Sequence, residues 1–168
     1  ACGVSDLGRT EPRGYGQSGY PGNPWVDLYV NGRAMQLARW PNDAFLNVGK
    51  VHAGRYNTDQ SNSPGEFDYL GERPPHWKTA QDVWMFGYWG HLWAGRSVKV
   101  SRLDVDRGRV TTAGPASYGF REGQPYYFFN VLEELDQPGE WYLDRTSGLL
   151  YLFPPKDFDG SVVQFSVF

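Results

Sequence analysis

The segment Trp25–Trp40 constrains the fold of this chain most strongly, because it carries the pattern of a β-hairpin. Its sequence is WVDLYVNGRAMQLARW, in which apolar residues alternate on each side of Asn31-Gly32. An Asn-Gly pair between two alternating runs is the strongest short hairpin signal, since both residues accept the positive φ angles of a two-residue turn. We therefore expect two antiparallel strands here, and we expect Pro41-Asn42 to end the second.

Shorter apolar runs recur along the rest of the chain and predict further strands. Hairpins are expected over Val98–Thr111 and Trp141–Phe153. Single strands are expected over Phe45–Ala53, Glu66–Leu70 and Val162–Phe168. The pattern over Tyr126–Leu135 fits either a strand or a helical turn. With 21 Gly and 12 Pro, the composition suits short strands joined by tight turns.

These patterns together predict an all-β fold. We expect one compact β-barrel or β-sandwich built from antiparallel hairpins, with long aromatic-rich loops. A chain of 168 residues has about the size of one domain with one core. Residues 1–168 are therefore expected to form a single domain, with an irregular arm over residues 1–24 and the β core over residues 25–168.

The charge and the motifs argue against several classes of function. The net charge of −3 lacks the basic excess typical of nucleic-acid binding. No stretch of about 18 uncharged apolar residues is present, so we expect no membrane partner. Gly14–Gly19 matches G-x-G-x-x-G, but turn residues stand where a nucleotide-binding fold needs a strand and a helix. Cys2 is the one cysteine, so an internal disulfide cannot form.

The segment Asp82–Gly95, DVWMFGYWGHLWAG, carries the main functional signal. Its rings are too many for an ordinary core strand, and its glycines indicate a bent or looped backbone. Rings on an irregular surface can stack on flat apolar faces, which both sugars and nucleobases present. Because the chain is not basic, sugars are the better match. A contiguous apolar surface of this kind also fits a protein interface.

From this segment and two turns that present aromatic residues, we predict a set of ligand-binding residues. The set consists of Trp77, Trp84, Tyr88, Trp89, His91, Trp93, Arg96, Tyr118 and Arg121. The aromatic members would stack on sugar rings, and the polar members would form hydrogen bonds with hydroxyls.

Two pairs of carboxylates are candidates for acid–base catalysis. Asp104 and Asp106 would lie at roughly 7 Å on one strand face, a spacing that suits an inverting glycosidase. However, Asp106 opens a D-R-G turn, where an aspartate usually caps the backbone. Glu133 and Glu134 are adjacent, so they would point to opposite faces of a strand, and we expect a solvated pair or an anchor for nearby backbone. No catalytic residue is predicted.

The sequence predicts neither a metal centre nor a cofactor. The histidines His52, His76 and His91 are dispersed, whereas a zinc site needs about three protein ligands. Asp157 and Asp159, in KDFDG, could hold a structural calcium ion, because calcium prefers oxygen ligands in loops.

Several segments resemble a known family over nearly the whole chain. They are VSDLGRTEPRGYG, LYVNGRAMQLARWPN, VWMFGYWGHLWAG and, most specifically, NVLEELDQPGEWYLDRTSGLLYLFPP. They look like the β-rich domain inserted in right-handed parallel β-helix carbohydrate-active enzymes of bacteria. The resemblance implies a secreted or periplasmic protein whose partner is a parent β-helix domain. In that family the catalytic carboxylates are generally carried by the β-helix, whose repeats are missing here.

Three functions are therefore open. The first is a non-catalytic carbohydrate-binding module, which binds a polysaccharide or oligosaccharide through exposed Trp and Tyr. The second is a structural insert that shapes the active-site groove of a parent glycoside hydrolase and has no ligand of its own. The third, a small hydrolase or lyase, would depend on the Asp104/Asp106 or Glu133/Glu134 pair.

Overall fold

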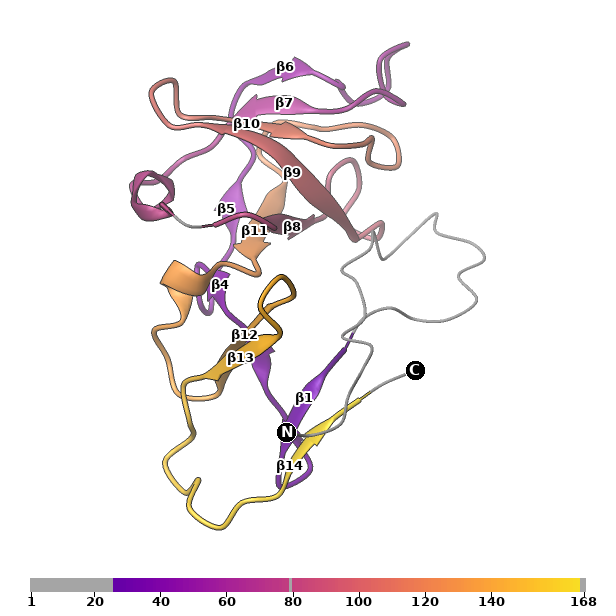
Figure 1. Ribbon diagram of the computed structural model, residues 1–168. Coiled ribbons are helices and arrows are strands. Elements are labelled where there is room, and N and C mark those ends of the chain that lie inside the picture. The colour runs from indigo at the N-terminus through magenta and orange to yellow at the C-terminus, as the bar shows by residue number, and fades with distance from the viewer. Residues whose placement is uncertain (1–25, 79, 167–168) are drawn as a thin grey trace.

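The computed structural model describes residues 26–78 and 80–166, which form β-strands with two short 3₁₀ helices (Figure 1). The expected arm over residues 1–24, the Gly14–Gly19 motif and Trp25 lie outside the described residues. In chain order the elements are β1 (Leu28–Val30), β2 (Arg33–Ala34), β3 (Gln36–Leu37), β4 (Arg39–Trp40), β5 (Leu46–Asn47), β6 (Val51–Ala53), β7 (Glu66–Asp68), η1 (Pro74–His76), β8 (Trp84–Gly87), β9 (Arg96–Asp104), β10 (Arg109–Thr112), β11 (Pro125–Phe129), η2 (Leu132–Glu134), β12 (Glu140–Asp144), β13 (Leu149–Leu152) and β14 (Val163–Phe165).

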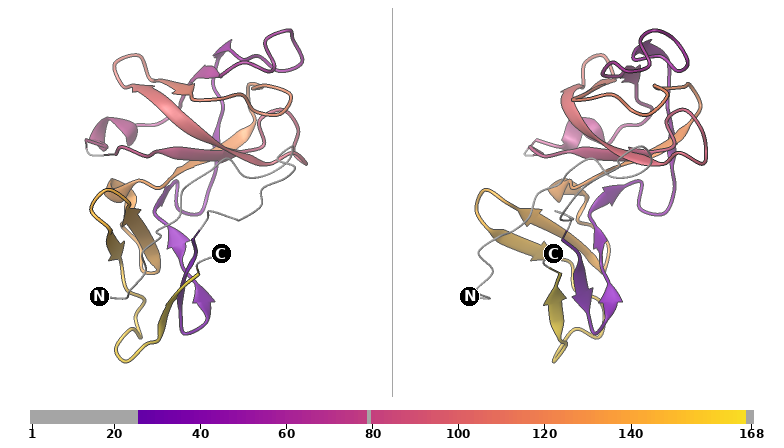
Figure 2. Two further views of the ribbon diagram at one scale, coloured as in Figure 1. Left: turned by 45° about the vertical axis from the view of Figure 1, so that its right-hand side comes forward. Right: turned by 90° about the vertical axis from the view of Figure 1, so that its right-hand side faces the viewer.

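The strands form three sheets. The largest has eight strands in the order β4-β11-β8-β9-β10-β7-β6, with β5 also paired to β11. Two three-stranded sheets, β14-β1-β2 and β13-β12-β3, lie below it in Figure 1 and in both turned views of Figure 2. The prediction of an all-β fold is confirmed. Of the two architectures expected, the described sheets form a compact, sandwich-like arrangement and do not close into a barrel.

The first hairpin forms where the Asn-Gly signal predicts it. Asn31 and Gly32 have φ angles of 51° and 75°, the positive values of a tight two-residue turn. Val30 pairs with Arg33, and Tyr29 with Ala34. The second strand, expected to continue to Trp40, is instead three short strands, β2, β3 and β4, each in a different sheet. The hairpins β9–β10 and β12–β13 are also present. The ambiguous segment contains both alternatives, since strand β11 is followed by the helical turn η2.

The strand expected over Phe45–Ala53 is instead two strands, β5 and β6. Between them the chain changes partner: the Val48 amide donates to Gln124 O, whereas the Gly49 amide donates to Asp68 O. A Cβ at Gly49 would lie 2.5 Å from Asp68 O, so the crossing requires glycine. The interruption follows from this change of partner within the large sheet.

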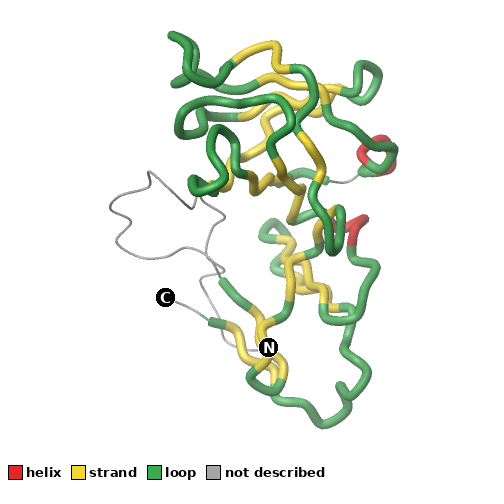
Figure 3. The backbone as a smooth tube through the Cα atoms, turned by 180° about the vertical axis from the view of Figure 1, so that it is seen from behind, coloured by secondary structure: helices red, strands yellow, loops and turns green. Residues whose placement is uncertain are grey.

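Two groups of buried side chains form the core. The larger group packs under the eight-stranded sheet and contains Phe67, Phe120, Tyr126 and Phe128 among others. Burial of each such side chain contributes about 1.5–3 kcal/mol. The smaller group consists of Val26, Leu28, Trp141 and Leu143, which join β1 to β12. Seen from behind in Figure 3, long loops connect the strands.

Candidate functional site

Trp89 holds together the loops that carry the exposed rings. Its side chain is 1% exposed, and its ring lies 5.1 Å from that of Phe120 and 5.7 Å from that of Tyr126. The indole Nε1 donates a hydrogen bond of 2.8 Å to Arg96 O, which closes the loop between β8 and β9. The Trp89 carbonyl accepts a bond of 2.9 Å from the Arg121 amide. One buried residue thus fixes two surface loops to the core.

Four rings from these loops and the neighbouring one meet: Tyr56, His91, Trp93 and Tyr118, here called the loop cluster. The His91 and Trp93 rings are stacked, with centroids 5.0 Å apart and an interplanar angle of 17°. Tyr118 meets His91 edge-on at 5.0 Å and Trp93 at 5.6 Å. Tyr56 meets His91 edge-on at 5.3 Å, and its hydroxyl lies 3.3 Å from His91 Nε2. The side chains of Trp93 and Tyr118 are 60% and 40% exposed.

The backbone of the β8–β9 loop explains why these rings can approach one another. The Ala94 amide donates to His91 O at 3.0 Å, so Leu92 and Trp93 project from a tight turn. A Cβ at Gly90 would lie 2.9 Å from Tyr118 Cβ and 3.0 Å from Tyr56 Cδ2. Glycine at this position therefore permits the close packing of the loop against both tyrosines.

Two arginines lie next to the loop cluster. The Arg121 guanidinium is 5.5 Å from the centre of the Tyr56 ring, within the range of a cation–π contact. Arg96 Nη1 donates a long hydrogen bond of 3.4 Å to Ser117 Oγ, in the loop that carries Tyr118. The cluster thus combines flat rings with hydrogen-bond donors that suit hydroxyl or carboxylate groups.

Of the nine predicted residues, five gather at this surface: His91, Trp93, Arg96, Tyr118 and Arg121. Tyr56 is the one ring of the cluster that the sequence did not reveal. It lies in the polar segment Gly54–Ser63, which predicts a loop and gives no sign of a binding role. The Tyr56 amide donates to Phe120 O and the Asn57 amide to Tyr118 O, and these bonds join the two loops.

Three predicted residues are buried, so their rings are not part of the exposed aromatic surface on which they were expected. Trp77 packs on Phe128 at 5.0 Å, and its indole donates to the Glu134 carboxylate. Trp84 lies opposite Phe129 in the sheet and donates to Asp82 Oδ1 at 3.1 Å. Trp89 is the core anchor described above. Each indole uses its N–H inside the protein, as buried tryptophans usually do.

Tyr88, the ninth residue, belongs to a different group of rings. It is half-buried on the outer side of the large sheet, where it contacts Phe86 at 5.5 Å and Phe45 at 6.3 Å.

The carboxylate pairs have structural partners. Asp104, rather than the expected Asp106, caps the turn: its Oδ1 accepts from the Arg107 amide at 3.2 Å. Burial alone would raise the pKa of Asp104, but hydrogen bonding by Arg107 and the charge of Arg102 outweigh burial and lower it. A carboxyl held ionised in this way is a poor general acid.

Glu134 is buried, which corrects the expectation of a solvated pair. Its Oε2 accepts a hydrogen bond of 2.6 Å from Arg73 Nη2. The interaction with Glu134, and with Asp136 nearby, raises the pKa of Arg73. Because the carboxylate also accepts from Trp77, it joins η1 to η2 and has a structural role.

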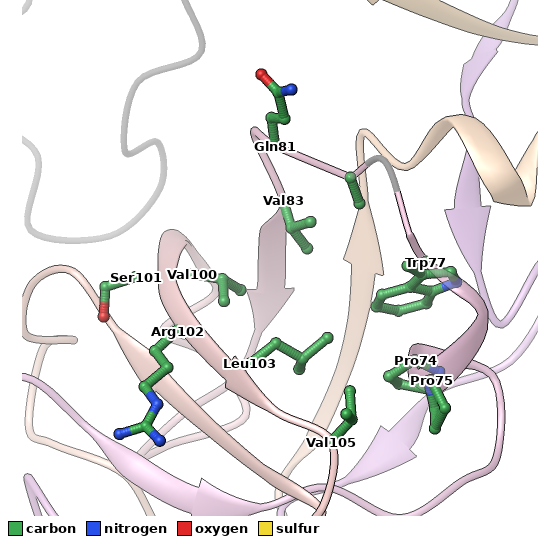
Figure 4. Close-up of a pocket in the computed structure, with 11 residues that line it drawn as sticks. Pro74, Pro75, Trp77, Gln81, Val83, Val100, Ser101, Arg102, Leu103 and Val105 are labelled. Carbon is green, nitrogen blue, oxygen red and sulfur yellow. The ribbon is translucent and has the colours of Figure 1, made fainter.

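Gln81 lines two hollows, of which Figure 4 shows the first. The first, of about 380 Å³, is lined mainly by apolar side chains, among them Trp77, Val83, Val100 and Leu103. In Figure 4 the Arg102 side chain points away from these residues. The second, of about 510 Å³, is lined by Asp82, Lys99, Tyr142, Asp144 and Arg145 among others. Lys99 Nζ lies 2.8 Å from Asp82 Oδ1, so two of these charges are paired.

The described part of the chain contains no group of three or more His, Cys, Asp and Glu residues that could hold a metal ion. Asp157 and Asp159 are both exposed, between β13 and β14. Nor does any helix within residues 26–78 and 80–166 have the length and apolar character needed to cross a membrane.

Comparison with known proteins relates the fold to part of a glycoside hydrolase. The scan against protein families and the search of curated proteins find no match. Among solved structures, a glycoside hydrolase matches 89% of this chain with a TM-score of 0.57 and 18% sequence identity. The match covers 27% of that chain, so this chain spans well under half the length of the solved protein. At this identity the match concerns the fold alone.

Proposed function

We propose that this domain is a non-catalytic carbohydrate-binding module and that it binds a polysaccharide through the loop cluster. The observation that carries the proposal is the convergence of Trp93, His91, Tyr118 and Tyr56, from loops distant in sequence, on one exposed surface. Stacking on such rings removes the CH-rich face of a sugar from water. Arg121 and Arg96 would then donate hydrogen bonds to hydroxyls at the edge of the sugar.

The relation to a glycoside hydrolase fold supports a carbohydrate ligand, and the structural roles of Asp104 and Glu134 support a non-catalytic domain. A polysaccharide ligand would also favour the proposed location outside the cytoplasm, in a secreted or periplasmic protein. A few stacking contacts of this kind give affinities from roughly millimolar to micromolar.

The test is retardation of the purified domain in native gels cast with mixed-linkage β-glucan, xylan, galactomannan or polygalacturonate. We expect selective retardation by one polymer, which Trp93→Ala and Tyr118→Ala should each reduce at least about tenfold, because each removes an exposed ring. Phe153→Ala is the matched control, since Phe153 is equally exposed but lies outside the cluster. Equal retardation of the wild type and both cluster variants would reject this surface as the binding site.

The second candidate is a structural insert that docks on a parent β-helix glycoside hydrolase, shapes its active-site groove and has no ligand of its own. It is favoured by exposed aliphatic side chains in the C-terminal part of the chain, away from the loop cluster: Leu149, Leu150, Val162 and Val163. Exposed aliphatic side chains suit a protein surface better than a sugar, because they offer neither a flat ring nor a hydrogen-bonding group.

A further inference from the structure

A second group of rings lies on the outer face of the eight-stranded sheet: Phe45, Phe86, Tyr88 and Tyr127, here called the sheet platform. Phe86 lies directly opposite Tyr127 in the register of β8 and β11, with ring centroids 5.6 Å apart. Their neighbours Met85 and Phe128 are paired in the same way and are buried in the core. Side chains alternate between the faces of a sheet, so the platform faces away from that core.

Contacts at both ends hold the platform rings in place. Phe45 meets Tyr127 at 5.6 Å and is 47% exposed. The Arg39 guanidinium lies 3.6 Å from the centre of the Tyr127 ring. Its Nε donates to Pro41 O at 2.8 Å and its Nη2 to Ala44 O at 2.7 Å, so the cation is fixed against the ring. The surface is therefore built before any ligand arrives, which lowers the entropy lost on binding.

The β8–β9 loop connects the sheet platform to the loop cluster. At one end of the loop, a Cβ at Gly90 would meet Tyr56 and Tyr118 of the cluster. At the other end, a Cβ at Gly95 would lie 2.8 Å from Phe86 Cζ and 3.0 Å from Tyr88 Cε1. The loop thus packs tightly on both groups. Between Tyr88 and Trp93 the backbone can span at most about 17 Å.

We propose that one polysaccharide chain lies across both groups of rings, so that the preferred ligand is an internal stretch of a long chain. This inference rests on the proposed function and extends the site from the loop cluster to the sheet platform. Because the backbone limits the separation to at most about 17 Å, a fragment of several sugar units is long enough to contact both groups. Once a chain is bound to one group, its contact with the other is intramolecular. The overall affinity then exceeds that for either group alone, provided that the chain spans the distance between them.

The chemistry of the platform favours a glycan over a protein partner. Tyr88 offers a ring together with a hydroxyl, Phe45 adds an exposed ring, and Arg39 adds a guanidinium that covers the Tyr127 ring at the same surface. Flat faces bordered by donors and acceptors match a sugar chain, which is apolar on its ring faces and polar at its edges. The surface of β13 differs in being mainly aliphatic: Leu149 and Leu150 are exposed there, with Tyr151 as its one exposed ring among the described residues.

The inference can be tested with disaccharide, tetrasaccharide and octasaccharide fragments of the polymer that retards the domain in the gel. Titration calorimetry on the wild type should give an affinity at least about tenfold higher for the octasaccharide than for the disaccharide, since further rings then contribute. Phe45→Ala should remove most of that gain and weaken octasaccharide binding more than disaccharide binding. Trp93→Ala should weaken binding of every fragment.

Leu70→Ala is the matched control, because Leu70 is as exposed as Phe45 but lies outside both groups. If affinity is independent of fragment length, or if Phe45→Ala binds the octasaccharide as well as the wild type does, the platform has no part in binding. Either result would leave the loop cluster as the site. If instead no polymer and no fragment binds the wild type, the proposed function itself is wrong.

Discussion

Trp89 shows how one side chain can belong to the core and still control a surface. Its ring packs among Phe67, Phe120 and Tyr126, while its N–H and its carbonyl fix the loops that carry Trp93 and Tyr118. A role in presenting the exposed rings therefore replaces the direct ligand contact that the sequence suggested. The distinction matters for mutagenesis, because loss of Trp89 affects the fold and the proposed site together.

We expect Trp89→Ala to lower the free energy of unfolding by about 3–5 kcal/mol, because it removes a large ring from a packed core. Trp89→Phe keeps a ring but leaves Arg96 O without its donor, at a cost of about 1–3 kcal/mol. Urea unfolding measures both values. Trp93→Ala serves as the comparison and should change stability by only about 0.5 kcal/mol, since Trp93 is largely exposed. A fully stable Trp89→Ala variant would contradict the anchoring role.

At the scale of single elements, the β8–β9 loop joins the two groups of rings, and Gly95 is the position that tests this. Gly95→Ala would place a methyl group against Phe86 and Tyr88 and push those rings from their positions. We expect an overpacking cost of about 1–3 kcal/mol and weaker binding of long fragments, with disaccharide binding less affected.

Gly114→Ala is the matched control, because nothing lies within 4 Å of the added Cβ and its φ angle is not positive. It should leave both stability and binding unchanged. If Gly95→Ala binds every fragment like the wild type, the loop and the platform are not mechanically connected.

Hairpins could be predicted from the sequence because their signals are local. The Asn31-Gly32 turn needs only two residues of the right conformation. In contrast, β12 pairs in parallel with β3, and Tyr56 meets His91 across 35 positions of the chain. No local pattern encodes such contacts, because they form only when the sheets pack.

The burial of individual rings was harder to predict. Strict alternation along β8 and through Gly87 places Trp89 on the same side as Met85. The structure shows that alternation is correct here, since both side chains belong to the larger core group. The glycines on either side suggested a break in the alternation instead. Trp84 is on the opposite face and is nevertheless buried, beside Phe129 and with Lys99 Nζ 5.8 Å from its ring. Its burial therefore depends on neighbours in the sheet that alternation does not describe.

At the scale of the whole molecule, exposed apolar residues also occur away from the loop cluster and the sheet platform. On β13 and at the start of β14 most of them are aliphatic, although Tyr151 is exposed there and Phe153 follows directly. Strand β13 is also at the end of its sheet, so among the described strands one of its edges has no partner. An apolar edge strand without charges is prone to pair with another chain.

This edge leads to a prediction for the isolated domain. We expect it to self-associate as its concentration rises, and Leu149→Lys to reduce that association, because Leu149 is 54% exposed on β13 and charged residues on an edge oppose pairing. Analytical ultracentrifugation over a range of concentrations measures the effect. Polysaccharide retardation should be unchanged in Leu149→Lys, since the ring surfaces are untouched.

If Leu149→Lys abolishes retardation, the glycan binds at β13 instead. If the wild type stays monomeric throughout, β13 is not a docking edge, and the argument for a structural role loses its main support.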